Sequence, residues 1–381
     1  MYSLHQEQEN LRAELRAFVD SEIVPAAAQL DHTGGLPREL FKEVGRRGYL
    51  DAAFAFPDSR ARYNTLEGTI IIEELSRGLA SLGLIISPHY QCTELIAAAG
   101  TEALKKEVLP GAKRADILFA FALSEESGGS DALGVDTIAI DAGDHWILNG
   151  KKCWITNAGY ADGYIVTAKS PSAERSRSVS LFYVGKDAPG LTIHSCGNMM
   201  GLRSAPMGDV IMKDCIIPKH CLIGSENLAY PLIKSLLNEG RLDMSAVAVG
   251  ISQAALELAV DRANKPGKFS RRLSSNQAVS FSIADMYTKT LAARQSTYYL
   301  ASKMANGAPN TIDAAAVKLF ATESCREICK AACQIYGASG LQQEADTNRL
   351  LRDSEMLTIA EGTSEICKIV ISNGVINSRP K

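Results

Sequence analysis

The sequence predicts a multidomain α+β protein: an all-helical N-terminal domain at residues 1–118, a middle β domain at 119–227 and an all-helical C-terminal domain at 228–381. The chain has 381 residues, which exceeds the usual size of one domain and leaves room for two or three units. Apolar residues recur at helical spacing in the first and last parts, whereas in the middle part they tend to alternate.

The N-terminal domain is predicted from two long helical patterns. These are TLEGTIIIEELSRGLASLGLII at 65–86 and CTELIAAAGTEALKKEVLP at 92–110. The opening stretch, MYSLHQEQENLRAELRAFVD, is polar and amphipathic and lacks the apolar core of a secretory signal. No apolar run approaches the roughly 18 to 20 residues that span a bilayer, so we expect no membrane partner.

Short runs rich in β-branched and aromatic residues predict the strands of the middle domain. Asn149-Gly150, inside the run at 145–155, is a strong signal for a hairpin turn. Several strands at such short spacing predict a small antiparallel sandwich or barrel. The predicted strands are DTIAI, HWILNGKKCWI, YIVTAK, VSLFYV, LTIHS and DVIMKDCIIP.

Helical patterns return at 243–263, 276–305 and 311–337. In the last of these, Cys325, Cys329 and Cys333 fall on one helix face. Three thiols in a row could bind a metal ion, but zinc sites usually have shorter cysteine spacing and ligands from more than one element. A buried stripe is the favoured interpretation because free cysteine packs as a small apolar residue, and we expect no metal.

Composition and missing motifs exclude several classes of protein. A net charge of −3 argues against a nucleic-acid partner, and nine scattered cysteines are typical of reduced thiols in the cytoplasm. The chain has no GxGxxG after a strand, no GxxxxGK[ST] and no HExxH. A Rossmann site, a P-loop and a zinc protease site are therefore not expected.

Two polar stretches beside predicted strands are candidate ligand sites. FALSEESGGSD at 121–131 exposes small residues and backbone N–H groups, although an ordinary domain linker has the same composition. KKCWITNAGYADGY at 151–164 contains Trp154, which either belongs to the core or stacks on a flat ligand while Thr156 donates a hydrogen bond.

A third candidate is IAEGTSEIC at 359–367, where Glu361 stands directly before Gly362. The glycine would let a ligand approach the backbone closely, and the glutamate could be a base shielded from water. The same residues also fit the start of a helix with Thr363 or Ser364 as its cap. The segment alone leaves both interpretations open.

Taken in order, these motifs resemble the acyl-CoA dehydrogenase family. The resemblance runs from about Gln6 to Ile376 through ALSExxxGSD, KxWITNAxxAD, MGLRS, NEGR, QIYGxxG, RD and EGTSE. It implies a C-terminal four-helix bundle and FAD bound without a Rossmann fold, between the middle and C-terminal domains. It also implies a homotetramer or at least a dimer, because some cofactor contacts come from a neighbouring subunit.

The resemblance assigns roles to individual residues. Glu361 is the expected catalytic base, and Gly362 lets the thioester approach the backbone. Arg241 and Asn238, in NEGR, together with Ser130, are expected to contact the substrate. The cofactor contacts are expected from Phe121, Leu123, Ser124, Gly129, Ser130, Trp154, Thr156, Phe269, Gln277, Gln334, Gly337, Thr363 and Glu365.

The implied reaction removes an α-proton from a thioester to Glu361 while the β-hydrogen leaves as hydride to flavin N5. Burial would raise the pKa of the carboxyl toward the working pH. In this family the flavin ribose hydroxyl and the backbone N–H of the catalytic glutamate are the donors to the thioester oxygen.

The sequence departs from the family at several positions. Ser124 replaces the usual Thr, and Glu126-Ser127 replaces Pro-Gly. Pro266 stands where an Arg is usual, which leaves open which nearby cation neutralises the FAD pyrophosphate. Ala360 replaces the Tyr that commonly precedes the base, so we expect a pocket that is open near the α and β carbons.

The substrate is the least determined part. TGGLPRELFKEVGRRGYL at 33–50 and EGTSEICKIV at 361–370 resemble the branch that oxidises short groups on acyl carrier proteins in polyketide extender-unit pathways. Four cations within 265–272 could dock an acidic carrier protein or simply serve FAD. The alternatives are a short or branched acyl-CoA dehydrogenase that reduces an electron-transfer flavoprotein, an oxidase that uses oxygen, and a catalytically silent flavin-binding member.

Overall fold

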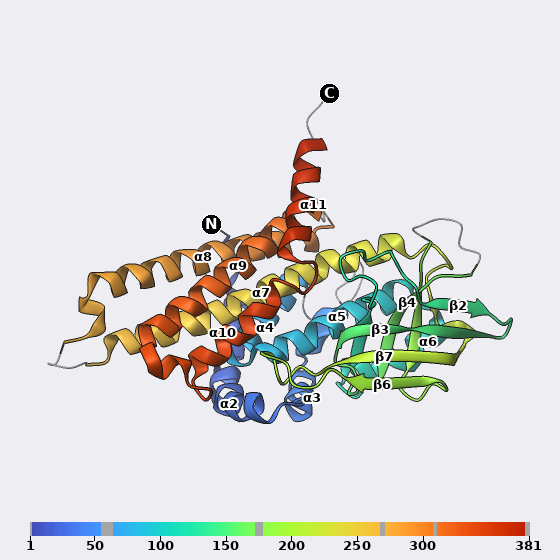
Figure 1. Ribbon diagram of the computed structural model, residues 1–381, viewed down its shortest axis with the longest axis horizontal. Helices are drawn as coiled ribbons and strands as arrows, with labels where there is room; N and C mark the ends of the chain where they lie inside the picture. Colours follow the sequence, from blue (N-terminus) through green and yellow to red (C-terminus); the bar gives the residue numbers. More distant parts are fainter. Residues whose placement is uncertain (1, 55–63, 172–177, 267–270, 308–310, 378–381) are drawn as a thin grey trace.

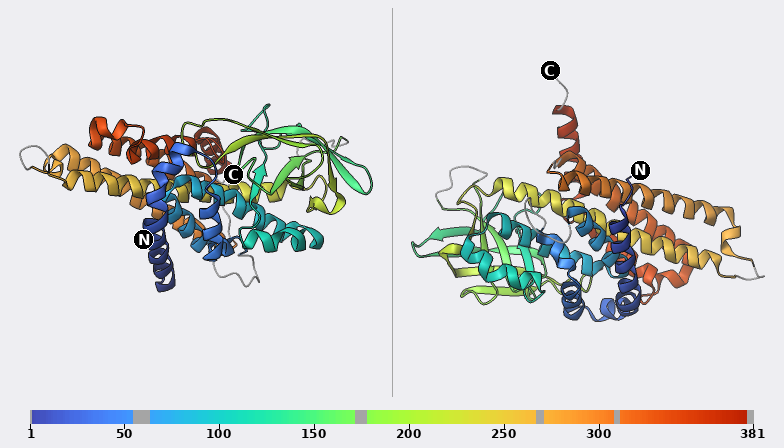
Figure 2. Two further views of the ribbon diagram at one scale, coloured as in Figure 1. Left: turned by 90° about the horizontal axis from the view of Figure 1, so that it is seen from below. Right: turned by 180° about the vertical axis from the view of Figure 1, so that it is seen from behind.

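The computed structural model describes residues 2–54, 64–171, 178–266, 271–307 and 311–377. The molecule is elongated, with the β-sheets at one end of its long axis and the helical bundle at the other (Figure 1). The two further views place the sheets at the same end (Figure 2). The predicted order of a helical, a β and a second helical domain is confirmed.

The N-terminal helices pack around two that are almost entirely buried. Helix α4 (Thr65–Gly78) begins with a capping box, in which Asn64 Oδ1 accepts from Leu66 N at 2.8 Å and Asn64 N donates to Glu67 Oε2 at 2.7 Å. Helices α4 and α5 (Ala80–Ala99) are buried on nearly every side, which is the environment of a core helix. The other elements are α1 (Gln6–Phe18), the π-helical turn η1 (Val19–Ile23), α2 (Val24–Thr33), α3 (Arg38–Arg46), the 3₁₀ turn η2 (Tyr49–Phe54) and α6 (Glu102–Lys113).

The middle domain is a sandwich of two four-stranded sheets, ordered β1-β4-β5-β8 and β2-β3-β7-β6. Trp146 of β3 and Phe182 of β5 meet between the sheets, with ring centroids 5.1 Å apart, so the core lies between the layers. Among the named strands of the described residues, β1 pairs with β4 in parallel and the other pairings are antiparallel. The strands are β1 (Phe119–Ala122), β2 (Ile138–Asp141), β3 (His145–Thr156), β4 (Gly163–Ala168), β5 (Ser180–Gly185), β6 (Leu191–Ser195), β7 (Met207–Pro218) and β8 (Leu222–Ile223), with a 3₁₀ turn η3 (Lys219–Cys221) before β8.

The predicted hairpin turn at Asn149-Gly150 is wrong. Strand β3 continues through both residues, and the pairing with β7 shifts register between Leu148 and Gly150. A Cβ at Gly150 would lie 2.3 Å from Thr137 Oγ1, so the glycine permits a close approach rather than a turn. Asn149 exchanges two hydrogen bonds with Asp214 of β7.

The C-terminal helices form a bundle in which α7 packs against α8, α9 and α10. The most apolar window of α7 is long and hydrophobic enough to cross a membrane, but 72% of it is buried inside the protein, as in a core helix. Cys325, Cys329 and Cys333 of α9 are buried, as the stripe interpretation predicts. The helices are α7 (Tyr230–Asn264), α8 (Gln277–Ala305), α9 (Thr311–Tyr336), α10 (Asp346–Leu357) and α11 (Ser364–Asn377), with 3₁₀ turns η5 (Leu273–Ser275) and η6 (Gly337–Leu341).

Candidate active site

Trp154 lies on an irregularity at the edge of the β sandwich. The pairing of β3 with β7 shifts between Lys152 and Ile155, and Trp154 has a left-handed φ of 60°. Its side chain is 63% exposed although it is a large aromatic residue. A bulge that turns an indole outward at a cost in backbone strain is typical of a ligand surface, and the alternative that Trp154 belongs to the core is wrong.

The loop after β1 lies directly beside this bulge. The N–H of Cys153 donates to the carbonyl of Ser124 at 2.8 Å, so the structure brings the two predicted stretches together. A Cβ built at Gly129 would meet no atom within 4 Å, which leaves the loop backbone open to a ligand. Of the other predicted contacts, Phe121 lies in β1 and Thr156 is the last residue of β3. Leu123 is half-buried and Ser130 is exposed.

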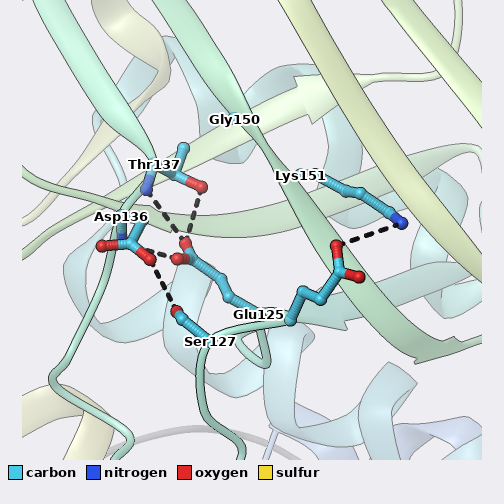
Figure 3. A pocket seen from close by; sticks show the side chains of 7 residues that line it. Glu125, Ser127, Asp136, Thr137, Gly150 and Lys151 are labelled. Atoms are coloured by element: carbon cyan, nitrogen blue, oxygen red, sulfur yellow. Dashed lines mark hydrogen bonds and ion pairs between the residues drawn. The ribbon is translucent and has the colours of Figure 1, made fainter.

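A buried ion pair holds the loop in place. Glu125 Oε1 lies 2.5 Å from Lys152 Nζ and accepts from Thr137 Oγ1 at 2.6 Å. Figure 3 shows the Glu125 carboxylate also accepting from the backbone N–H of Asp136, whose own carboxylate accepts from Ser127 Oγ. Burial lowers the pKa of Lys152 to about 8, while Lys152 holds the pKa of Glu125 below its usual value, so both groups remain charged at neutral pH. Glu125 and Lys152 are site-supporting residues that sequence analysis missed.

Glu361 lies in the turn between α10 and α11, where its φ is 54° and that of Gly362 is 94°. Its carboxylate packs against helix α7 at Gly240, where a Cβ would lie only 2.3 Å from Oε2. Gly240 stands inside a helix, where glycine is destabilising. The contact with Glu361 explains why a glycine occupies this position. The sequence signals this contact only by a glycine directly before Arg241. Glu361, the partner of that glycine, lies 121 residues further along the chain.

The environment of Glu361 favours a carboxyl that can exchange a proton near neutral pH. Burial raises its pKa to about 7, while Arg241 and Lys318 act in the opposite direction. Lys318 of α9 is fully buried, and its Nζ donates to the carbonyl of Gly362 at 2.8 Å. Arg241 Nη1 donates to Asn238 Oδ1 at 3.0 Å, and its buried Nε has no partner in the described part of the chain. Sequence analysis also missed Lys318. Its only signal was the position of a lysine on the apolar side of a predicted helix.

The helix-cap interpretation applies to Thr363 and not to Glu361. Helix α11 begins at Ser364, and Thr363 Oγ1 accepts from the N–H of Ile366 at 3.3 Å. Ser364 Oγ donates to Glu323 Oε1 at 2.5 Å. Glu365 is exposed in the first turn of α11. The Glu361 side chain is thereby free for another role.

Three predicted cofactor contacts lie elsewhere. Gln277 begins α8, Gln334 lies near the end of α9 and Gly337 begins η6 directly after it, and all three are exposed. The start of α8 and the end of α9 are at the end of the bundle away from the sheets (Figure 1), so one chain keeps these residues apart from the sheet that carries Trp154. Phe269 lies outside the described residues.

The structure also shows where the residues that depart from the family pattern lie. Pro266 forms an isolated β-bridge with Arg272, and Arg271 and Arg272 line a surface depression with Ser274 and Ser275. Ala360 packs against the edge of the main core. Glu126 is exposed, and its carboxylate lies 3.8 Å from Lys151 Nζ.

Comparisons with known proteins agree with the resemblance over the whole chain. Family models described as the N-terminal, middle and C-terminal domains of acyl-CoA dehydrogenase match residues 5–116, 120–215 and 230–376. A probable acyl-CoA dehydrogenase, YngJ, from Bacillus subtilis is 35% identical, covering 98% of this chain and 99% of the relative. A short-chain specific acyl-CoA dehydrogenase from Clostridium acetobutylicum is 32% identical over the same shares of the two chains.

Among solved structures, a glutaryl-coenzyme A dehydrogenase in complex with glutaryl-CoA superposes with a TM-score of 0.95 at 30% identity, covering 100% of this chain and 97% of that one. The family's cofactor is FAD, and an exposed indole beside an open, small-residue loop fits a flavin ring. The chain therefore belongs to the acyl-CoA dehydrogenase family and is an FAD-dependent oxidoreductase of that type.

Proposed function

We propose that the protein oxidises a short or substituted acyl-CoA thioester between its α and β carbons, with Glu361 as the base. The observation that carries this is the partly buried Glu361 carboxyl, which is seated on Gly240 beside Arg241 and whose pKa is raised to about 7. A general base is most effective when its pKa lies near the working pH. The short-chain choice is supported by the relative from Clostridium acetobutylicum and by Ala360, which puts no ring beside the base.

In the proposed reaction the Glu361 carboxylate takes the α-proton, and the electrons of that C–H bond form the Cα=Cβ double bond. The β-hydrogen leaves with its electron pair as hydride. FAD, when bound, supplies the acceptor for this hydride. Gly362 leaves the backbone accessible, the N–H of Glu361 is the proposed donor to the thioester oxygen, and Lys318 holds the turn by its bond to the Gly362 carbonyl.

The residues that hold FAD are proposed from two regions. One is the loop after β1 with the Trp154 bulge, and the other is the far end of the bundle of a neighbouring subunit. We propose a homotetramer or dimer for this reason. The first region comprises Phe121, Leu123, Ser124, Gly129, Ser130, Trp154 and Thr156, the second Gln277, Gln334 and Gly337, and Thr363 and Glu365 follow the base in the sequence. Phe269, outside the described residues, is a further proposed contact.

CoA is the proposed tether because the two relatives compared above are acyl-CoA dehydrogenases. An acyl carrier protein is the alternative tether. An electron-transfer flavoprotein is the proposed acceptor, with oxygen as the alternative, and the cytoplasm is the proposed location.

The test uses the purified flavoprotein under anaerobic conditions. Butyryl-CoA, octanoyl-CoA and butyryl-carrier protein are mixed with it, and the loss of flavin absorbance is followed. We expect reduction by butyryl-CoA and weaker reduction by octanoyl-CoA. A flavin that no acyl thioester bleaches would identify a silent member, and a clear preference for octanoyl-CoA would contradict the short-chain proposal.

A further inference from the structure

Two motifs of the sequence, MGLRS at 200–204 and RD at 352–353, have no role in the site described above, and the fold brings them together. MGLRS lies in the loop between β6 and β7, and RD lies in α10, the helix that leads to the Glu361 turn. A Cβ at Gly201 would lie 2.3 Å from the carbonyl oxygen of Arg352, so the loop packs directly against the backbone of the helix. The β domain and the C-terminal domain are therefore in close contact at this point.

Arg352 connects all three domains through one guanidinium group. Its Nη1 donates to the carbonyl of Met200, in the β domain, at 2.9 Å. Its Nη1 and Nη2 also pair with the two carboxylate oxygens of Asp31, in α2, at 3.2 and 2.5 Å. The side chains of Arg352 and Asp31 are 11% and 8% exposed, so the pair is largely shielded from water. Such a two-pronged pair fixes the orientation of its partners as well as their distance.

Asp353 provides a second link between the same loop and the same helix. Its Oδ1 accepts from the N–H of Leu202 at 2.6 Å, and its side chain is buried. Leu202 is also buried and has a left-handed φ of 53°, a conformation that is costly for a residue with a Cβ. The bond to Asp353 helps to hold this conformation. We call Asp31, Arg352 and Asp353 the interdomain clamp.

On the β side, the clamped loop leads within a few residues to the strand that carries Trp154. The carbonyl of Pro206 accepts from the N–H of Asn157 at 2.8 Å. Met207, the first residue of β7, pairs with Thr156, the last residue of β3. The position of the loop is thereby transmitted to the end of β3, two residues from Trp154.

On the helical side, the clamp is connected to Glu361 by an ordered segment. Helix α10 ends at Leu357, which is fully buried, four residues before Glu361. The carbonyl of Met356 accepts from the N–H of Ile359 at 2.9 Å and from that of Ala360 at 3.1 Å. A shift of α10 as a rigid body would therefore carry Glu361 with it.

The energetics of the clamp favour a role in geometry. A buried ion pair contributes little net stability, because the cost of desolvating both charges offsets most of their attraction. A bidentate arginine–carboxylate pair nevertheless accepts only a narrow range of geometry, so the clamp holds α2, the MGLRS loop and α10 in one arrangement. Such placement matters for a reaction, because misplacing a reacting group by about 1 Å can lower its rate on the order of 10²-fold.

We infer that the interdomain clamp sets the position of the Glu361 turn relative to the Trp154 edge of the β domain. Asp31, Arg352 and Asp353 are then positioning residues for the reaction, each acting through the loop or the helix that it holds. The inference rests on the proposed function for the roles of Glu361 and the flavin.

Arg352→Gln tests the clamp, and Arg38→Gln is its matched control. Arg38 of α3 also connects two domains, through Asp162 at 2.9 Å and the carbonyl of Tyr160 at 3.4 Å. Among the described residues its bonds reach neither α10 nor the MGLRS loop. We expect the rate of flavin reduction at saturating butyryl-CoA to fall at least about tenfold in Arg352→Gln and to stay within about twofold of wild type in Arg38→Gln. FAD content and the butyryl-CoA concentration that gives half of the limiting rate should be unchanged in both, because the clamp acts on placement and not on binding.

Two variants of Asp353 separate the hydrogen bond from the bulk of the side chain. Asp353→Asn keeps an oxygen that can accept from Leu202, whereas Asp353→Leu has a similar shape and no acceptor. We expect Asp353→Asn to reduce flavin at close to the wild-type rate and Asp353→Leu to be slowed as Arg352→Gln is. Melting curves identify any variant that fails to fold, and Asp31→Asn, which weakens the pair from the N-terminal domain, then takes the place of Arg352→Gln.

Amide hydrogen exchange gives a readout that needs no turnover. Breaking the clamp should speed exchange at 355–363 in Arg352→Gln, whereas Arg38→Gln should exchange there as wild type does. Should no thioester reduce the wild-type flavin, the proposed function fails and this measurement decides the inference alone.

The remaining outcomes are distinct. A normal limiting rate in folded Arg352→Gln would overturn the inference while leaving the oxidation of butyryl-CoA in place. An equal loss of rate in Arg38→Gln would also overturn it, because a general loosening of the domains would then explain both results. Exchange at 355–363 that the clamp variants leave unchanged would show that α10 does not depend on the clamp for its position.

Discussion

Glu361 is placed by contacts from two helices that are remote in the sequence. Gly240 of α7 leaves room for its carboxylate, Lys318 of α9 binds the next carbonyl, and the turn itself connects α10 to α11. The left-handed backbone at Glu361 is unusual for a glutamate and costs on the order of 1–3 kcal/mol. Strain at a residue with a shifted pKa is characteristic of functional positions.

The first prediction concerns Glu361→Gln, which keeps the shape of the side chain and cannot accept a proton. Flavin reduction by butyryl-CoA should fall by at least about 10²- to 10⁴-fold, the effect of losing a positioned general base. Thermal stability should not be lost, because a neutral amide is easier to bury than a carboxylate. Stopped-flow reduction and a melting curve measure the two effects.

Glu344→Gln, at an exposed position in the same domain, is the control for this prediction. A purely structural role for Glu361 predicts the reverse result, with stability lost and reduction close to normal. That pattern would remove Glu361 from the reaction.

The second prediction concerns pH and follows from the pKa of Glu361, which burial raises from 4.5 to about 7. Between these values the folded protein retains a proton that the unfolded chain has released, so this group makes wild-type stability fall as pH rises. Glu361→Gln lacks the effect, and its melting temperature relative to wild type should increase from about pH 4.5 to about pH 7. The wild-type rate of flavin reduction should rise through the same upper range as the base loses its proton.

The difference between the two melting curves isolates Glu361 from the other titrating groups that both proteins share. A difference that stays constant over this range would show that the carboxyl is not shifted.

At the level of elements, the sequence predicted helices and strands better than it predicted contacts between them. The helical periodicity of 65–86 and 243–263 identified α4, α5 and α7 because burial on a helix repeats every three to four residues. The turn at Asn149-Gly150 failed because pairing with β7 on one side and packing against Thr137 on the other outweighed a local preference.

The candidate site was predictable only where its residues fall in continuous motifs. Glu361, Arg241 and Trp154 stand in such motifs. Gly240 also stands in one, but it acquires its role, as Lys318 does, from the distant turn at Glu361 and Gly362, which no local spacing indicates. Contacts of this kind depend on how helices dock, which a single sequence does not specify.

The third prediction tests one link between elements, the bond from Lys318 of α9 to the carbonyl before α11. Lys318→Met keeps the length of the side chain and leaves the Gly362 carbonyl with the weak Cys367 Sγ donor at 3.6 Å in place of the ammonium. Loss of a buried hydrogen bond of this kind should reduce the free energy of unfolding by about 1–3 kcal/mol, and a loosened turn should slow flavin reduction. Chemical denaturation and stopped-flow reduction measure both.

Lys330→Met, at an exposed position of the same helix, serves as the control and should change neither quantity appreciably. An unchanged unfolding free energy in Lys318→Met would show that water replaces the lysine without cost.

At the level of the whole molecule, the elongated shape separates the two groups of proposed flavin contacts. The sheets lie at one end of the long axis, and the start of α8 and the end of α9 lie at the other (Figures 1 and 2). Both groups can contact one cofactor only if a second copy supplies one of them.

The fourth prediction follows from this separation. Sedimentation of the purified flavoprotein should give a dimer or a tetramer, and Gln334→Ala should lower FAD occupancy without loss of secondary structure. The control is Gln343→Ala, another exposed glutamine in the C-terminal domain. A monomer that retains one FAD per chain would contradict the shared site.

The ion pair of Glu125 with Lys152 has a consequence for how the cofactor enters the protein. Because this pair and the Cys153–Ser124 bond hold the loop against the sandwich, its conformational entropy is lost when the β domain folds and not when the flavin arrives. Protein stripped of FAD should therefore keep a receptive surface at Trp154. The rate at which FAD rebinds should then depend on its access to this surface. No slow kinetic phase from ordering of the loop beside the sandwich is expected.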